Sequence, residues 1–195
     1  MKRIFDIVMS GLGLICLSPL FVVLAVWIKC DSSGPVFYRQ VRVGRHNRDF
    51  RLFKFRSMRP GSDRKGLITV GGRDPRVTRS GYYIRKYKLD ELPQLINVFI
   101  GDMSLVGPRP EVRKYVDMYN AEQMHVLDVR PGITSLASIR YRDENDILAA
   151  AEDPDRAYVE QVMPDKIAID LEYVAKASLA TDIALIFRTF KAILS

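Results

Sequence analysis

One apolar segment near the N-terminus limits what this chain can fold into more than any other feature of its sequence. Across residues 4–28 the only charged residue is Asp6. At about 1.5 Å per residue, a helix of this length measures roughly 37 Å, which is enough to cross a hydrocarbon core about 30 Å thick. The segment therefore predicts an N-terminal helix in contact with a membrane.

Three interpretations of this segment compete. A cleaved signal peptide would begin at Lys2-Arg3, but the apolar stretch is long and no small-x-small cleavage site follows it. A straight spanning helix conflicts with Ser18-Pro19, because proline lacks a backbone donor and disfavours a helical backbone at the residue before it. Proline kinks are nevertheless tolerated in membrane helices, so the spanning helix stays open.

The third interpretation is a re-entrant hairpin that bends at Ser18-Pro19 and leaves the membrane on the side where it entered. Its two arms, residues 4–17 and 20–28, are each too short to span a bilayer comfortably. Cations flank both ends of the segment, and the positive-inside rule then places both ends in the cytoplasm. These cations are Lys2, Arg3, Lys29, Arg39, Arg42 and Arg45. The physical cues favour the hairpin slightly over the spanning helix.

The bulk composition is that of one folded, basic domain. Of the 195 residues, 48% are hydrophobic and 27% are charged, so the chain can bury a core. The net charge of +7 suits nucleic acid, an anionic membrane or a polyphosphate ligand. Cys16 and Cys30 form no disulfide framework or Cys-x-x-Cys metal site, and His46 and His125 lie far apart in the sequence, which disfavours a histidine-rich metal site.

The pattern after the apolar segment predicts mostly helices with a small strand cluster. Residues 36–38 and 50–58 are typical of two strands that pair as a hairpin, and Lys54 and Arg56 share one face of the second strand. Further along the chain, helices are predicted at residues 92–100, 111–129, 143–152, 154–163 and from 164 to the end with a break near Ser178, and a strand is predicted at residues 135–141.

Two other segments suit a charged or apolar partner. The polar loop at residues 59–80 carries Arg73, Arg76 and Arg79, which either reach a polyanionic substrate or are plain solvated charges. The last helix gathers its apolar residues on one stripe, which suits a core or a membrane surface. That stripe includes Ile183, Ile186, Phe187 and Phe190.

The most informative polar feature is the pair Asp90-Glu91, which follows a cluster of cations and opens an apolar helical pattern. A helix N-terminus favours acidic residues, and Asp90 stands where an N-cap belongs, so the pair has a purely structural explanation. Its surroundings favour chemistry instead. Cations in the neighbouring motifs are Lys54, Arg56, Arg85, Lys86, Lys88 and Arg109, the last held between Pro108 and Pro110.

Several fixed cations near two carboxylates suit phosphoryl transfer, where positioning and charge neutralisation supply most of the catalysis. One carboxylate can attack phosphorus and form an acyl phosphate. Its neighbour can hold Mg²⁺, which prefers oxygen ligands and usually shares substrate phosphates. The sequence contains no Walker loop and no Gly-x-Gly-x-x-Gly motif, which argues against nucleotide binding of those types.

These residues together resemble the monotopic phosphoglycosyl transferases, a bacterial sugar transferase family, in its minimal catalytic form. The resemblance covers nearly the whole chain in order, which makes it far more specific than any single motif. The matching stretches are Lys2-Arg3-Ile4-Phe5-Asp6, Ser18-Pro19, residues 34–40, residues 53–58, Leu89-Asp90-Glu91-Leu92-Pro93-Gln94, residues 97–98 and 101–111, Arg130-Pro131-Gly132-Ile133-Thr134, and Asp182-Ile183 with Thr189.

The resemblance implies an α/β fold that is mostly helical, with a re-entrant membrane helix at residues 1–30 and a cytoplasmic catalytic domain at residues 31–195. It implies membrane-surface amphipathic helices and a place on the bacterial inner membrane, in contact with anionic lipid. The implied reaction moves a sugar 1-phosphate from a UDP-sugar to polyprenol phosphate and releases UMP. A homodimer is a candidate assembly.

The resemblance also implies roles for single residues. Asp90 is the nucleophile that forms a covalent phosphosugar, and Glu91 is the Mg²⁺ ligand. Substrate contacts are expected from Lys54, Arg56, Arg85, Pro108, Arg109, Pro110 and Arg130. After Thr134, where many members continue Gly-Trp/Leu-Ala-Gln-Val-Asn-Gly-Arg, this chain differs across residues 135–144. The resemblance therefore implies the chemistry without naming the sugar.

The rival interpretation is a non-catalytic basic peripheral membrane protein that binds anionic lipid. It accounts for the +7 charge and the apolar N-terminus, but it gives no reason for Asp90-Glu91 among cations. A nucleic-acid reader would also need exposed aromatic or base-reading positions, and the sequence identifies none. We therefore expect no nucleic-acid partner, and the enzyme is the favoured interpretation.

Overall fold

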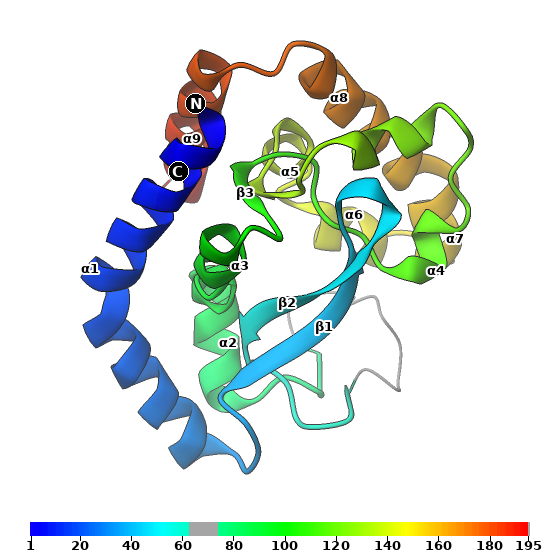
Figure 1. Cartoon of the computed structure of the whole chain (residues 1–195). Coiled ribbons are helices and arrows are strands. Elements are labelled where there is room, and N and C mark those ends of the chain that lie inside the picture. Colours follow the sequence, from blue (N-terminus) through cyan, green and yellow to red (C-terminus); the bar gives the residue numbers. More distant parts are fainter. Residues whose placement is uncertain (63–73, 195) are drawn as a thin grey trace.

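The apolar N-terminal segment forms one long helix, α1 (Lys2–Asp31), in the computed structural model. Figure 1 shows α1 along one side of the molecule, with its N-terminal end beside the C-terminal helix α9 (Leu179–Leu194). The structure describes residues 1–62 and 74–194. The other described elements are β1 (Phe37–Val43), η1 (Arg45–Asn47), β2 (Asp49–Phe55), α2 (Arg79–Lys86), η3 (Leu89–Glu91), α3 (Gln94–Ile100), β3 (Ser104–Val106), α4 (Arg113–Val116), η4 (Gln123–Asp128), β4 (Gly132–Thr134), α5 (Leu136–Arg140), α6 (Glu144–Ala149), α7 (Pro154–Ala157), η5 (Tyr158–Val162) and α8 (Met163–Ala175).

The structure does not confirm the predicted hairpin with two separate arms, because α1 continues through Ser18-Pro19. Pro19 has no backbone N–H to donate to the carbonyl of Ile15. The Ser18 hydroxyl donates to that same carbonyl at 2.8 Å, so the acceptor that proline leaves free is satisfied inside the helix. Figure 1 shows α1 bent near its middle rather than folded back on itself.

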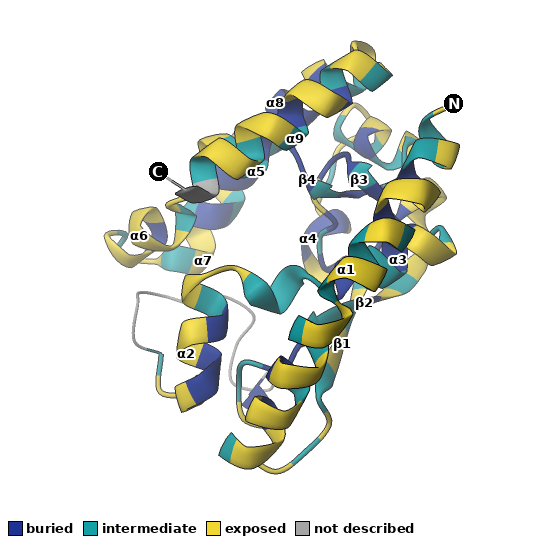
Figure 2. Ribbon diagram, turned by 90° about the vertical axis from the view of Figure 1, so that its left-hand side faces the viewer, coloured by how far each residue is buried: buried dark blue, intermediate teal, exposed yellow. Residues whose placement is uncertain are grey.

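Most of the α1 surface is exposed, as the yellow ribbon in Figure 2 shows. Among the described residues it is the one helix long and apolar enough to cross a membrane, by length and composition, and only 11% of its most apolar stretch is buried. Exposed apolar side chains on it include Ile4, Val8, Leu12, Ile15, Val22, Val23 and Val26. On α9, Phe187 and Phe190 are also exposed. That these helices lie on a membrane stays a prediction.

The strand cluster consists of two small sheets. β1 and β2 pair antiparallel, as predicted, with Lys54 opposite Tyr38. β3 and β4 pair parallel. The predicted strand at residues 135–141 is wrong: this segment contains helix α5, because the Ser135 hydroxyl accepts a hydrogen bond from Ser138 N and caps the helix. The predicted helix at residues 111–129 is reduced to the short elements α4 and η4.

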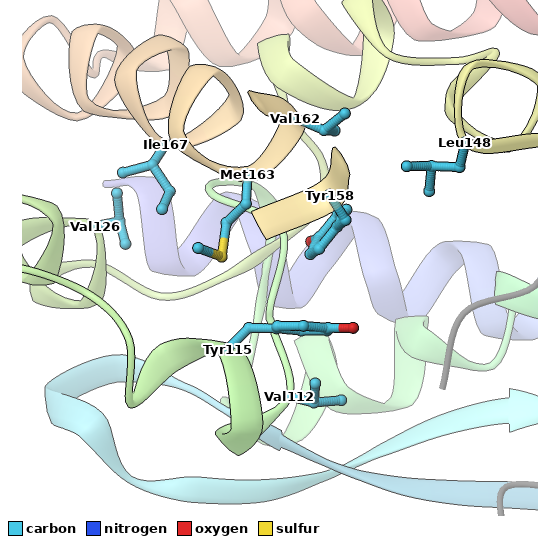
Figure 3. Close-up of a cluster of buried hydrophobic side chains, with 8 residues drawn as sticks. All are labelled: Val112, Tyr115, Val126, Leu148, Tyr158, Val162, Met163 and Ile167. Carbon is cyan, nitrogen blue, oxygen red and sulfur yellow. The ribbon is translucent and has the colours of Figure 1, made fainter. Parts of the chain in front are cut away.

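Two buried clusters hold the parts of the chain that matter for the site. The cluster in Figure 3 lies between α4, η4, η5, α6 and α8, where the Tyr115 and Tyr158 rings have centroids 4.9 Å apart. It includes Val112, three residues after Arg109, and therefore supports the loop that carries this arginine. Its members are Val112, Tyr115, Val126, Leu148, Tyr158, Val162, Met163 and Ile167. A second cluster joins α1 to β2 and α2 through Leu24, Ile28, Phe55 and Ile84.

Gly132, the first residue of β4, packs against the backbone of Gly107, which follows β3. A Cβ at this position would stand 2.1 Å from Gly107 N, which is backbone and has no room to move. We expect Gly132→Ala to lower the unfolding temperature in detergent by roughly 6–12 °C, corresponding to about 3 kcal/mol. Gly11→Ala is the control, because its Cβ would meet only the flexible Phe99 ring, at 3.3 Å. Equal shifts for the two variants would contradict this account of the strand pair.

Candidate active site

Asp90 and Glu91 lie in the short 3-10 helix η3, within the turn that joins α2 to α3. Lys88 precedes them in the left-handed region, with φ +55°, and this conformation redirects the chain after α2. The expectation that Asp90 caps the following helix is wrong, because Pro93 occupies the N-cap position of α3 and no side chain caps that helix. Both carboxylates therefore remain available for other contacts.

Glu91 is bound by two of the predicted cations. Arg109 meets it as a fork: Nη2 donates to Oε1 at 2.5 Å and Nη1 donates to Oε2 at 3.3 Å. Lys54, from β2, donates to Oε1 at 2.9 Å. Paired forks of this kind fix both the position and the plane of a carboxylate. Three sequence segments, at β2, η3 and the loop after β3, thus meet at one side chain.

The charges around Glu91 keep it ionised. Burial would raise its pKa, but Arg109 and Lys54 outweigh burial and hold the pKa of Glu91 well below its usual range. The same pairing raises the pKa of Arg109, chiefly through the charge of Glu91. The site therefore holds a fixed anion between two fixed cations.

Asp90 differs from its neighbour in having no fixed partner among the described residues. Its carboxylate makes no hydrogen bond or ion pair with any side chain or backbone group that the structure describes. Burial and the adjacent Glu91 raise its pKa, while the charges of Lys54, Arg85 and Lys88 oppose that rise. Asp90 is thus a partly buried carboxylate with cations nearby and no donor bound to it.

The structure separates the other predicted site residues into two groups. Pro108 and Pro110 are buried and flank Arg109, and Arg85 lies on α2 within electrostatic reach of Asp90. The Arg56 guanidinium is bonded to backbone, because it donates to the carbonyls of Ser32 and Ile28 at the end of α1, at 2.7 and 3.3 Å.

Arg130 is likewise bonded to a backbone carbonyl, because its Nε donates to Gly101 O at 2.9 Å. In the loop at residues 59–80, Arg73 lies outside the described residues. Arg76 is paired with Asp74, and Arg79 opens α2. Arg56, Arg130 and Arg76 thus bind backbone carbonyls or a local carboxylate, which is a use that sequence alone does not distinguish from phosphate binding.

Sequence reasoning missed two acids behind Arg109. Glu111 accepts from Arg42 at 3.0 Å and from Val112 N at 2.7 Å, and so fixes the end of the Arg109 loop. Asp170, on α8, is 5% exposed, and its Oδ1 has no hydrogen-bond partner among the described residues. Burial raises the pKa of Asp170 to about 6. A lone acid among apolar neighbours in residues 167–171 was the available signal.

Comparison with known proteins now identifies the family. A family model described as bacterial sugar transferase matches residues 1–195. The chain belongs to the bacterial sugar transferase family. The chain is 42% identical over 197 residues to the UDP-N-acetylgalactosamine-undecaprenyl-phosphate N-acetylgalactosaminephosphotransferase of Aeromonas hydrophila, and the alignment covers 100% of this chain and 44% of that protein.

Two further relatives show the range of the family. The UDP-glucose:undecaprenyl-phosphate glucose-1-phosphate transferase of Escherichia coli (strain K12) is 37% identical over 193 residues, or 97% of this chain and 39% of that protein. The exopolysaccharide production protein ExoY of Sinorhizobium fredii is 35% identical over 207 residues, or 98% of this chain and 84% of that protein. The chain thus spans less than half the length of the first two relatives and most of the third.

The carboxylates of the site could hold a magnesium ion only together with the phosphates of a substrate. Among the residues the structure describes, no three His, Cys, Asp or Glu side chains gather into a metal cluster. Asp90 and Glu91 offer two adjacent carboxylates, and Glu91 Oε2 accepts only the longer arm of the Arg109 fork. One or two carboxylates together with substrate phosphates form the usual magnesium site in phosphoryl transfer.

Proposed function

We propose that this chain transfers a sugar 1-phosphate from a UDP-sugar to polyprenol phosphate, of the undecaprenyl type, with release of UMP. The product is a polyprenyl diphosphate sugar, the first lipid-linked unit of a bacterial glycan such as an O-antigen, capsule, exopolysaccharide or glycoprotein glycan. The relatives' names support the substrates. The observation that carries the proposal is the contrast between paired Glu91 and unpaired Asp90.

The unpaired carboxylate supports a two-step reaction. An oxygen of Asp90 attacks the phosphorus that bears the sugar, an oxygen–phosphorus bond forms, and the bond to UMP breaks. The phosphate oxygen of the polyprenol phosphate then attacks the same phosphorus and releases the Asp90 carboxylate. Asp90 suits the first step because no donor has to be removed from it, and partial burial leaves it weakly solvated.

The cations around the pair suit the charge that such a reaction handles. Lys54 and Arg109 bind Glu91, one residue from the nucleophile, and the charge of Arg85 on α2 lowers the pKa of Asp90. A UDP-sugar brings a diphosphate to this site, and fixed cations stabilise both its binding and the charge that develops in transfer. Glu91 orients Lys54 and Arg109 through its three hydrogen bonds.

Glu91 and the substrate diphosphate together would hold Mg²⁺. When bound, the ion neutralises phosphate charge.

We further propose that α1 anchors the protein in the bacterial inner membrane, beside anionic lipid, with residues 31–195 on the cytoplasmic face. The exposed apolar surface of α1 supports this placement.

The substrate is tested by measuring UMP release from a panel of UDP-sugars with undecaprenyl phosphate and Mg²⁺. We expect at least one donor to give UMP and a lipid-linked sugar in equal amounts, and omission of the polyprenol phosphate to stop turnover after the first equivalent. Failure of every UDP-hexose and UDP-N-acetylhexosamine, in a preparation that still binds anionic vesicles, would favour the non-catalytic lipid-binding protein.

A further inference from the structure

Strand β3 has an unusual environment, because only one of its edges is paired with another strand. Ser104 N donates to Pro131 O at 2.8 Å and Gly107 N donates to Thr134 O at 3.0 Å, both toward β4. The other edge faces the N-terminal end of α1. Unpaired groups on a buried strand edge are costly, so their partners show what fixes the strand.

Two charged side chains of the apolar helix satisfy that second edge. Asp6 Oδ1 accepts from Leu105 N and from the Ser104 hydroxyl, each at 3.1 Å. Lys2 Nζ donates to Val106 O at 3.0 Å. Asp6 is 2% exposed and Ser104 is fully buried, so water does not replace these contacts. All three residues of β3 are therefore bonded to α1.

Lys2 is itself fixed by the C-terminal part of the chain. It forms an ion pair with Asp182 of α9, and Tyr173 of α8 donates to the same carboxylate at 2.5 Å. Figure 1 shows the N-terminal end of α1 beside α9. The N-terminal end of α1 is thus held in place by contacts with β3, α8 and α9.

The segment that follows β3 leads directly into the candidate active site. Gly107 and Pro108 follow β3, and Pro108 O accepts from Gly132 N at 2.9 Å. Arg109 comes next and places its guanidinium fork on Glu91. The two prolines beside Arg109 restrict the backbone of the loop. A displacement of β3 would therefore also displace the Arg109 guanidinium.

We propose that Asp6 and Lys2 are positioning residues, which fix strand β3 and thereby hold Arg109 on Glu91, so that correct seating of the apolar helix is coupled to catalysis. The inference rests on the proposed function for its effect on rate. The anchoring itself does not depend on the reaction. A displacement of about 1 Å at a catalytic group lowers a rate by up to about a hundredfold, which sets the size of the effect.

Two matched pairs of variants test the proposal. Asp6→Ala removes the acceptor for Leu105 N, whereas Asp6→Asn keeps an acceptor oxygen of the same shape. Lys2→Met removes the cation that contacts Val106 O, whereas Lys29→Met removes an exposed cation near the other end of the same helix. Lys2→Met carries the test by itself if Asp6→Ala does not accumulate as folded protein.

Hydrogen exchange tests whether Asp6 and Lys2 hold β3 and the Arg109 loop, and this measurement does not depend on enzymatic activity. In peptides covering residues 106–111, we expect amide exchange about tenfold faster in Asp6→Ala and Lys2→Met than in the parent. We expect Asp6→Asn and Lys29→Met to stay close to the parent. Unchanged exchange in both Asp6→Ala and Lys2→Met would overturn the proposal, even if the proteins are less stable elsewhere.

A double-mutant cycle decides the coupling to catalysis. We expect Asp6→Ala to lower kcat for UMP release about 10- to 100-fold, and to cause no further loss in an Arg109→Ala background. Losses that multiply would overturn the coupling, because Asp6 would then act independently of Arg109. If the parent itself releases no UMP, the proposed function fails, while the exchange measurement still decides whether Asp6 and Lys2 hold the Arg109 loop.

Discussion

Asp90→Asn is expected to lower the rate of UMP release by at least about a thousandfold, because an amide of the same shape cannot attack phosphorus as a carboxylate does. The loss should fall on kcat, with binding of the UDP-sugar largely kept, since Asp90 contacts none of the described cations directly. The rate is measured by UMP release with undecaprenyl phosphate and Mg²⁺, on protein that has the parent's unfolding temperature.

Asp117→Asn provides the matched control. Asp117 is an exposed aspartate whose ion pair with Arg113 spans 3.7 Å on the surface, and exposed pairs of this kind contribute little. We expect its rate to stay within about twofold of the parent. A rate for Asp90→Asn within tenfold of this control would contradict the nucleophile assignment.

The pH dependence of the same reaction follows from the environment of Asp90. Burial and Glu91 raise the pKa of Asp90, and attack requires the ionised form. Activity should therefore fall on the acid side at a higher pH than an ordinary aspartate would give, in profiles of kcat/KM against pH. An acid limb at or below the usual aspartate range would show that another group controls the step.

Arg109→Lys is expected to lower kcat/KM about a hundredfold or more, although the charge is kept. A lysine makes one contact where the guanidinium makes a fork with both oxygens of Glu91. Loosening the fork also lets the pKa of Glu91 rise from its depressed value. Stability that comes from ionised Glu91 is present above its unfolded pKa and lost as pH falls through the depressed folded pKa, so in this variant the contribution is smaller and its loss is complete at a higher pH.

Arg113→Lys is the control for this substitution. Its side chain is 36% exposed, as is that of Arg109, and it also pairs with a carboxylate, that of Asp49. We expect a change in kcat/KM below about threefold, because this pair lies at the surface and away from Glu91. Equal losses in Arg109→Lys and Arg113→Lys would show that the guanidinium fork has no special role.

The sequence predicted the charged cluster more fully than the framework around it. Asp90, Glu91, Lys54 and Arg109 were predicted to share one site, and the structure places Lys54 and Arg109 on Glu91, next to Asp90. Their roles in a reaction stay a prediction. Arg56 and Arg130 could not be separated from them, since a guanidinium that caps a helix end reads the same in sequence as one that waits for phosphate.

The framework depends on tertiary contacts that leave weak local signals. Ser135 reads as part of a strand, yet its hydroxyl caps α5. Ser18-Pro19 reads as a break, yet the Ser18 hydroxyl satisfies the freed carbonyl and α1 continues. Asp6 belongs to a family-matching stretch, but its contact with β3 could be seen only in the fold. In each case a side-chain hydrogen bond that the local sequence does not predict decides the backbone.

The central claim is that Asp90 carries the sugar phosphate between donor and acceptor. The most direct test is the intact mass of the protein after incubation with its UDP-sugar and Mg²⁺, without polyprenol phosphate. We predict an added mass equal to one sugar phosphate on the parent, located on the peptide that contains Asp90, absent from Asp90→Asn and removed when polyprenol phosphate is supplied. Turnover by the parent with no adduct at any time, or an adduct of equal yield on Asp90→Asn, would contradict the account.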